Sequence, residues 1–287
     1  MANLRAIRTR IKSVENTQQI TKSMKMVAAA KLRHTQTAFS SLKEFAARSE
    51  EMLARVSDCA AGAVNPLLRA HETNEKVCYV LIVGNRGLCG TYNSALLRYL
   101  EDLADKEPRE KSLVVCGRWG KDMIPGAGLP IRASFEISDA PDAKEAAALA
   151  DALRKLYTDG EADEIVLVYQ RFQSVLQQNP VSRTLLPLTL RPQEEAEGED
   201  RLYLFEPDRE SLLNTLVEMT FVNTVHAVLL ESRTGEHSAR MTAMTAAADN
   251  TEELIGELTL QLNHARQAAI TTEISEIAGG AEALKNK

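Results

Sequence analysis

Residues 241–270 read MTAMTAAADNTEELIGELTLQLNHARQAAI, and this stretch decides the fold. Apolar or small side chains recur in it at alternating intervals of three and four residues. They are Met241, Met244, Ala248, Thr251, Ile255, Leu258, Leu262, Ala265 and Ala269. This spacing is typical of a helix that packs along one side against another helix. The sequence therefore predicts one helix of a coiled coil, with a seam of mostly small residues.

The positions of proline and glycine indicate how far the helical ends extend. All nine prolines lie between Pro66 and Pro207, and residues 1–61 contain neither proline nor glycine. At 1.5 Å per residue, helices of about 60 and about 80 residues would be roughly 90 and 120 Å long. A compact domain of this size does not enclose such helices. We therefore expect residues 1–65 and 208–287 to pair as an antiparallel coiled coil.

The N-terminal stretch carries its own apolar stripe, with one predicted break. The stripe begins with Leu4, Ile7, Ile11 and Val14. After a slip in the spacing, we expect it to resume at Ile20, Met24 and Val27. It continues toward the middle of the chain at Phe39, Leu42, Ala46, Leu53 and Val56.

The middle of the chain, residues 66–207, has a different pattern. Apolar runs at 77–83, 113–116 and 165–169 are typical of buried parallel strands. Helical patterns at 94–103 and 143–157 separate them. This alternation predicts a Rossmann-like, doubly wound α/β domain between the two helical ends. The fold class is therefore α/β plus long helices.

Two further stretches of the middle region are expected at its edge. Residues 181–190 and 202–205 have the composition of edge strands, where proline is tolerated. The acidic stretch 194–200 is predicted to form a solvated hairpin tip.

Composition and charge narrow the class of protein. Hydrophobic residues make up 44% and charged residues 26% of the 287, typical of a chain that buries a core. The four cysteines show no paired spacing and the apolar runs are shorter than about 18 residues, so we expect neither a disulfide framework, a zinc site nor a membrane span. The net charge is −6, yet residues 1–35 carry eight Lys or Arg against Glu15 alone. This basic helix suits an acidic protein surface, an anionic lipid surface or a solvated face. Nucleic acid is not expected, because no aromatic side chains are interleaved there.

The sharpest local motif is GNRGLCG at residues 84–90, between a predicted strand and a predicted helix. A phosphate-binding loop would occupy this position, but the spacing fits neither G-x-G-x-x-G nor G-x-x-x-x-G-K-[ST]. A tight structural turn is therefore favoured over a nucleotide site. For Cys89 we favour a buried thiol over a nucleophile, since no histidine is near in sequence. We assign no catalytic, cofactor-binding or metal-ligating residue.

Four stretches together resemble one known family. They are ITKSMKMVAAAKLR at 20–33, RGLCGTYN at 86–93, EHSARM at 236–241 and ARQAAIT at 265–271. The chain resembles the gamma subunit of bacterial F-type ATP synthases over essentially its whole length. The resemblance implies a non-catalytic rotor that couples proton flow to ATP synthesis or hydrolysis. Its coiled coil would turn inside a ring of three alpha and three beta subunits. Its α/β foot, residues 66–207, would rest on the membrane c-ring beside the epsilon subunit, on the cytoplasmic face of the inner membrane.

The resemblance also implies roles for individual residues. Arg266 and Gln267 match a pair that hydrogen-bonds a loop of a beta subunit. Further beta contacts are implied for Met24, Lys22, Lys25, Lys31 and Arg33. Contacts of the foot with the c-ring and epsilon are implied for Tyr203, Phe205, Glu206 and Asp208. The end of the chain, 270–284, would lie in an apolar bearing, and no cofactor is implied.

Two other interpretations of the sequence stay open. The first is a stand-alone α/β enzyme that uses the loop at 84–90 for a nucleotide and its helical arms for dimerisation. The second is a coiled-coil scaffold without a motor role, which does not explain the ordered motifs.

Overall fold

The computed structural model describes residues 2–59, 65–123, 128–188, 206 and 208–285. By internal contacts, the chain divides into two compact units. The α/β unit is Ala28–Arg240, and the coil unit combines Met1–Val27 with Met241–Lys287. The predicted boundaries at residues 65 and 207 divide the chain by sequence pattern rather than by contacts, and they stay a prediction.

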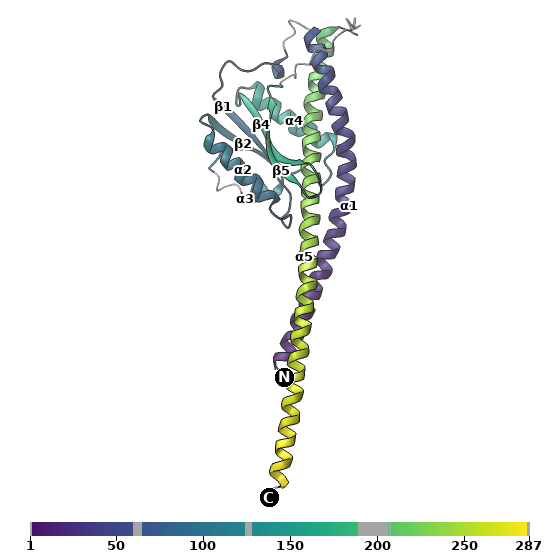
Figure 1. Ribbon diagram of the computed structural model, residues 1–287. Coiled ribbons are helices and arrows are strands. Elements are labelled where there is room, and N and C mark those ends of the chain that lie inside the picture. The colour runs from purple at the N-terminus through teal and green to yellow at the C-terminus, as the bar shows by residue number, and fades with distance from the viewer. Residues whose placement is uncertain (1, 60–64, 124–127, 189–205, 207, 286–287) are drawn as a thin grey trace. The chain divides into compact units, whose positions relative to one another are not determined.

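Two long helices account for both ends of the chain. Helix α1 is Ala2–Cys59 and helix α5 is Arg209–Lys285, so both predicted helical ends are confirmed. Each helix contributes residues to both units. Within each unit the two helices run antiparallel, as the direction of the colour ramp shows (Figure 1).

A five-stranded sheet forms the centre of the α/β unit, in the order β3-β2-β1-β4-β5. The strands are β1 Lys76–Ile82, β2 Glu110–Cys116, β3 Ile131–Phe135, β4 Glu164–Phe172 and β5 Gln178–Leu186. The first four pair in parallel, and β5 pairs antiparallel to β4 at the edge. All three predicted apolar strands are therefore confirmed.

The predictions at the sheet edge have mixed outcomes. The run at 181–190 overlaps β5, which is an edge strand as expected. Strand β3 was not predicted, because none of its residues is fully buried and it lacks a continuous apolar run. The expected strand at 202–205 and the acidic hairpin tip at 194–200 lie outside the described residues.

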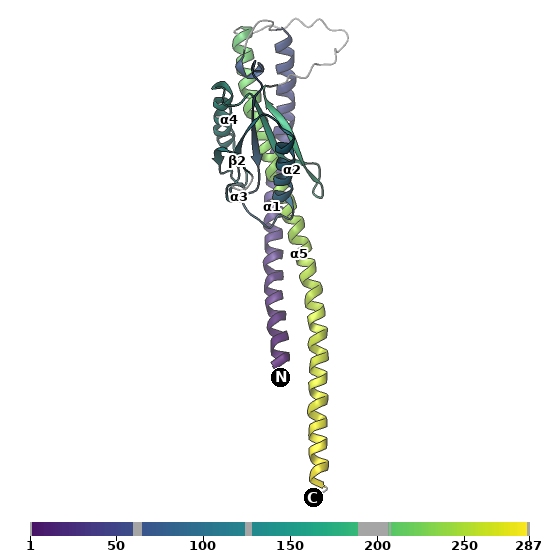
Figure 2. The same ribbon diagram turned by 90° about the vertical axis from the view of Figure 1, so that its left-hand side faces the viewer.

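Helices cover both faces of the sheet. The sheet helices are α2 Tyr92–Lys106, α3 Arg118–Met123 and α4 Ala143–Thr158, and a 3-10 helix, η1, spans Pro66–Leu68. Helices α2 and α4 lie on opposite faces (Figure 1 and Figure 2). Helix α4 begins with a capping box, in which Asp142 accepts from the amides of Lys144 and Glu145. The doubly wound arrangement is thereby confirmed.

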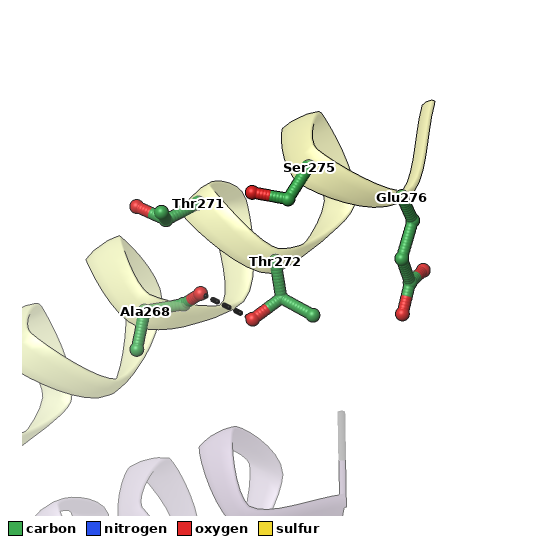
Figure 3. Close-up of a pocket in the computed structure, with 5 residues that line it drawn as sticks. All are labelled: Ala268, Thr271, Thr272, Ser275 and Glu276. Atoms are coloured by element: carbon green, nitrogen blue, oxygen red, sulfur yellow. Dashed lines mark hydrogen bonds between the residues drawn. The ribbon is translucent and has the colours of Figure 1, made fainter. Parts of the chain in front are cut away.

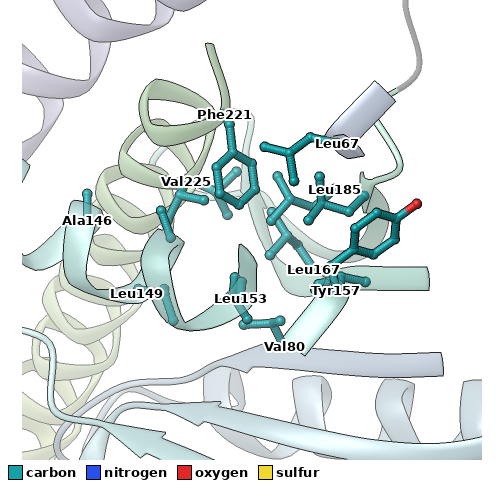
Figure 4. Close-up of a cluster of buried hydrophobic side chains, with 14 of the residues drawn as sticks. Leu67, Val80, Ala146, Leu149, Leu153, Tyr157, Leu167, Leu185, Phe221 and Val225 are labelled. Carbon is teal, nitrogen blue, oxygen red and sulfur yellow. The ribbon is translucent and has the colours of Figure 1, made fainter. Parts of the chain in front are cut away.

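Two apolar clusters hold these layers together. On one face, side chains of α4 and α5 pack on alternate residues of the strands. Figure 4 shows Phe221 and Val225 of α5 beside Leu149 and Leu153 of α4 in this cluster. On the other face, α2 packs on the remaining strand residues, among them Tyr79 and Leu81. Burial of both faces explains why the strands are continuous apolar runs.

The seam of the coil unit confirms the prediction for α5 and corrects the one for α1. All nine predicted seam residues of α5 are buried or partly buried. On α1 the predicted slip is wrong, because Ile20 and Val27 are 59% and 54% exposed. The three-four spacing instead continues unbroken through a mainly polar set, Gln18, Thr21, Lys25 and Ala28. The hydroxyl of Thr21 donates to the carbonyl of Gln18 at 2.9 Å, which explains how the seam tolerates it.

One helix of the described chain is long and apolar enough to cross a membrane by length and composition. It is α5, and half of its most apolar 18-residue window is buried inside the protein. Such burial is typical of a core helix.

Candidate functional site

The carboxyl ends of β1 and β4 lie where the sheet changes winding direction, between α2 on one face and α4 on the other. In open α/β sheets, ligands bind in the crevice at this point. Here, residues 231–240 of α5 occupy it. The amide of Phe172, at the end of β4, donates to Glu231 Oε1 at 3.1 Å. The hydroxyl of Tyr92 donates to the carbonyl of Ser232 at 2.7 Å. We call residues 231–240 the junction segment.

Arg233 is the centre of the junction segment and is only 1% exposed. Its Nη1 donates to the carbonyl of Val83 at 3.3 Å and to Glu236 Oε2 at 2.5 Å. Its Nη2 donates to Asn85 Oδ1 at 3.2 Å and to the carbonyl of Ile137 at 2.9 Å. A single planar guanidinium therefore joins α5 to the end of β1 and to the segment that follows β3.

Glu236 neutralises the charge of Arg233 and is also 1% exposed. Its second oxygen accepts from Arg240 Nη2 at 2.7 Å. Burial opposes ionisation of the carboxyl, but the two guanidinium groups outweigh it and hold the pKa of Glu236 below its ordinary value. Breaking one partner of such a buried set leaves an uncompensated charge, which is strongly destabilising.

The glycine-rich loop at 84–90 packs against the carboxylate of Glu236. A Cβ added to Gly84 would lie 2.9 Å from the carboxyl carbon of Glu236, so any larger residue there would displace this carboxylate. Arg240 donates to the carbonyls of Arg86 and Gly87, at 3.2 and 3.4 Å. Leu88 and Gly90 have positive φ angles of 61° and 60°. The predicted tight turn is confirmed, and α5 itself fills the position that a bound phosphate would take.

Cys89 lies in this turn as a buried thiol, 2% exposed. Burial raises the pKa of Cys89 above its ordinary value, which disfavours the reactive thiolate. The expectation of a buried structural cysteine is confirmed.

The segment 137–141, between β3 and α4, contacts α5 at three positions. Besides the bond from Arg233 to Ile137, His237 Nε2 lies 3.1 Å from the carbonyl of Asp139. His226 Nε2 lies 2.9 Å from the carbonyl of Pro141. Because a carbonyl only accepts, each Nε2 carries the proton. Burial lowers the pKa of His237, which favours the neutral ring at neutral pH.

A pocket near the end of α5 lacks the features of a small-molecule site. Figure 3 shows a shallow pocket that Ala268, Thr271, Thr272, Ser275 and Glu276 line from one side of α5. Thr272 Oγ1 donates to its own helix, at the carbonyl of Ala268, rather than into the pocket. Small-molecule sites gather polar groups from several elements, which this pocket does not. In the described part of the chain, no group of three His, Cys, Asp or Glu side chains is placed to hold a metal ion.

The residues that the resemblance implied for beta contacts are divided between the two units. In the coil unit, Arg266 and Gln267 are exposed, and Met24 and Lys25 are partly buried. Lys22 is exposed, with its ammonium 3.9 Å from Glu252 on α5.

The remaining predicted site residues lie elsewhere. In the α/β unit, Arg33 is exposed and Lys31 forms an ion pair with Asp139. Of the predicted foot contacts, Tyr203 and Phe205 lie outside the described residues, and Glu206 is exposed. Asp208 precedes α5 and accepts from the amide and hydroxyl of Ser211, both at 2.8 Å, as a helix cap does.

Comparison with known proteins decides the family. A family model described as ATP synthase matches residues 3–284. An ATP synthase gamma chain from Desulforamulus reducens is 43% identical over 286 residues, which cover 99% of this chain and 100% of that one. This chain belongs to the ATP synthase gamma chain family. A gamma chain from Desulfitobacterium hafniense is also 43% identical over 286 residues, with the same coverage.

Solved structures share the fold of this gamma chain. A chain from the Euglena gracilis mitochondrial ATP synthase, in its OSCP/F1/c-ring part, aligns with a TM-score of 0.71 at 20% identity. The alignment covers 99% of this chain and 95% of that one. A rotor chain of the same enzyme aligns with a TM-score of 0.63 over 94% of this chain and 99% of that one. As a gamma chain, the protein is a subunit of ATP synthase.

Sequence reasoning identified the loop at 84–90 and the motif at 236–241 but missed their shared partner, Arg233. One feature of the sequence could have indicated that Arg233 is buried. The apolar pattern of α5 stops after Leu230 and resumes at Met241, although the helix continues. A helical stretch without an apolar stripe that is nevertheless buried must find polar partners.

Proposed function

We propose that this gamma chain transmits torque from a membrane rotor ring to the catalytic sites of alpha and beta subunits. The observation that carries the proposal is a contrast along α5. Its junction segment is fixed in the α/β unit by buried charges, whereas every residue from Ile270 to Gly279 is exposed. A shaft needs one end that is fixed to the driving domain and another that is free to act on partners.

The beta subunits are the proposed partners of the exposed polar residues. Arg266 and Gln267 would hydrogen-bond a beta loop, because a guanidinium holds a carboxylate with two parallel bonds. Lys22, Lys25 and Arg33 would face acidic loops of beta, with Met24 beside them. The resemblance implies the same role for Lys31, but the described partner of Lys31 is Asp139 of its own chain.

The two ends of the molecule would have different neighbours. The end of α5 carries exposed Ile270, Ile274 and Ile277, which would turn in an apolar bearing formed by three alpha and three beta subunits. In the foot, Tyr203, Phe205, Glu206 and Asp208 would contact the c-ring and the epsilon subunit. The complex would lie on the cytoplasmic face of a bacterial inner membrane.

Reconstitution tests this proposal. The chain is mixed with purified alpha and beta subunits, and a bead is attached to the exposed position Asp105→Cys on α2. We expect a complex that hydrolyses ATP and rotates the bead in one direction. A chain that stays alone and binds ATP through residues 84–90 would contradict the proposal and favour the stand-alone enzyme.

A further inference from the structure

The segment 137–141 reaches both long helices within the α/β unit. Its carbonyl groups accept from Arg233, His226 and His237 of α5. Its one ionised side chain, that of Asp139, forms an ion pair with Lys31 of α1. One short segment after β3 therefore connects the sheet, α5 and α1.

The contact of Lys31 with Asp139 is a partly buried one. The two side chains are 38% and 39% exposed, and the residues lie 108 positions apart in sequence. Burial disfavours the charged carboxylate, but the hydrogen bond and charge of Lys31 outweigh it and hold the pKa of Asp139 below its ordinary value. The carboxylate is therefore ionised at neutral pH and the pair carries opposite full charges.

The position of this contact in the chain matters. On α1, Lys31 lies four residues inside the α/β unit, which begins at Ala28 after Val27 of the coil unit. On α5, His237 lies four residues before Met241, where the coil unit resumes. Asp139 thus holds each helix close to the residue at which it passes from one unit to the other.

Both helices bury side chains at this point, among them Leu32 and Thr35 of α1, but their charged contacts are very unequal. Helix α5 has the buried network of Arg233, Glu236 and Arg240. Helix α1 contacts β5 through Glu50 and Arg183, at 2.7 Å, but this contact is nearly twenty residues further from the transition. A coiled coil transmits torque more rigidly when both of its helices are tied to the driving domain than when one of them is.

We propose that Lys31 and Asp139 are positioning residues for torque transfer, which tie α1 to the segment that also holds α5. This inference rests on the rotor function proposed above. In the intact enzyme the pair prevents α1 from slipping along α5 under load. Lys31 would therefore act within the chain, unlike Lys22, Lys25 and Arg33, which we assign to beta.

The test uses the complete enzyme, assembled with its membrane part in sealed vesicles. Lys31→Gln, Asp139→Asn and the double variant are compared with the unchanged chain. ATP hydrolysis and ATP-driven proton pumping are measured on the same vesicles. We expect each single variant to lower the ratio of pumping to hydrolysis by about twofold, and the double variant to be no worse than either single one. Glu136→Gln is the matched control, because it breaks an exposed ion pair with Arg118 at the position immediately before the segment 137–141.

Each result decides the matter. If the two single effects add in the double variant, the residues act separately and the inference is wrong. If hydrolysis and pumping fall in equal proportion, or if Glu136→Gln has the same effect, the contact is only structural and the inference is also wrong. Vesicles with the unchanged chain that hydrolyse ATP without pumping would contradict the proposed function itself.

Discussion

Helix α5 contains two stretches that differ in almost every physical respect. Residues 232–238 are all buried although most are polar, and each of the charged groups among them has an ionic partner. Residues 270–279 are all exposed although several are apolar. In these two stretches, burial is thus opposite to what side-chain polarity alone would predict.

The two stretches differ because one contacts groups of its own chain and the other is available to partner proteins. The junction segment has its polar partners inside the chain, so its sequence is explained by the fold. The exposed isoleucines have no described neighbour in the chain that would explain them, and large exposed apolar stretches mark contact surfaces. One helix therefore combines a stretch selected for attachment with a stretch selected for partners.

Removal of the Arg233 side chain should destabilise the junction segment more than any other substitution proposed here. We expect Arg233→Met to lower the free energy of unfolding by about 3–5 kcal/mol, since Glu236 keeps only Arg240 as its partner. Urea unfolding of the isolated chain measures the change. A second variant, Arg233→Met with Glu236→Gln, should be more stable than the single one. A loss below about 1 kcal/mol for Arg233→Met would mean that the network does not hold the junction.

A methyl group at Gly84 tests the fit of the junction more gently. The added Cβ meets the carboxyl of Glu236, which two arginines hold in place, so we expect Gly84→Ala to cost about 1–3 kcal/mol. The control is Gly87→Ala in the same loop, where the added Cβ would have no atom within 4 Å. We expect it to stay within about 0.5 kcal/mol of the unchanged chain. Equal losses for both variants would show that the loop, not the packing against α5, is responsible.

The neutral ring of His237 adds a pH dependence to the junction. Its pKa in the folded chain is lowered by burial, so the unfolded chain binds a proton more readily. The free energy of unfolding should therefore fall as the pH decreases below about 6.5. The variant His237→Gln should make this decrease shallower, whereas His264→Gln, at an exposed position, should not. Urea unfolding at about pH 8 and about pH 5.5 checks the slope, and parallel slopes for all three proteins would refute the assignment.

Substitutions at exposed residues near the end of α5 should leave the isolated chain stable but impair the assembled enzyme. Arg266→Ala with Gln267→Ala should change the stability of the isolated chain by less than about 0.5 kcal/mol, because both side chains are exposed. In membrane vesicles with the complete enzyme, the same variant should lower ATP synthesis by about twofold or more, as the loss of an interfacial arginine does. The control is Glu257→Gln on the same helix. Unchanged synthesis would remove Arg266 and Gln267 from the proposed beta contacts.

The sequence predicted the elements that depend on local periodicity. The seam of α5 and the strands β1, β2 and β4 follow from apolar spacing alone, and the structure confirms them. The predicted slip near Ile20 was wrong because it followed the apolar residues, whereas the continuous pairing of two helices fixes the seam even through Thr21 and Lys25.

The junction could be predicted only in part. The glycine-rich loop and the motif at 236–241 were visible, yet nothing in their spacing relates them to Asp139 or Lys31. Such partners become neighbours through the crossover connections of the sheet, which bring distant residues to one edge. The exposed end of α5 was assigned by resemblance, because exposure to a partner leaves no periodic signal of its own.

Hydrogen exchange along α5 tests the central claim most directly. Amide exchange is compared between the isolated chain and its complex with alpha and beta subunits. We predict that the junction segment exchanges slowly in both, since its protection comes from the chain itself. Residues 266–279 should exchange rapidly in the isolated chain and become protected in the complex. Equal protection of both stretches before assembly, or no gain at 266–279 after it, would contradict the division of α5 into an attached and a partner-facing part.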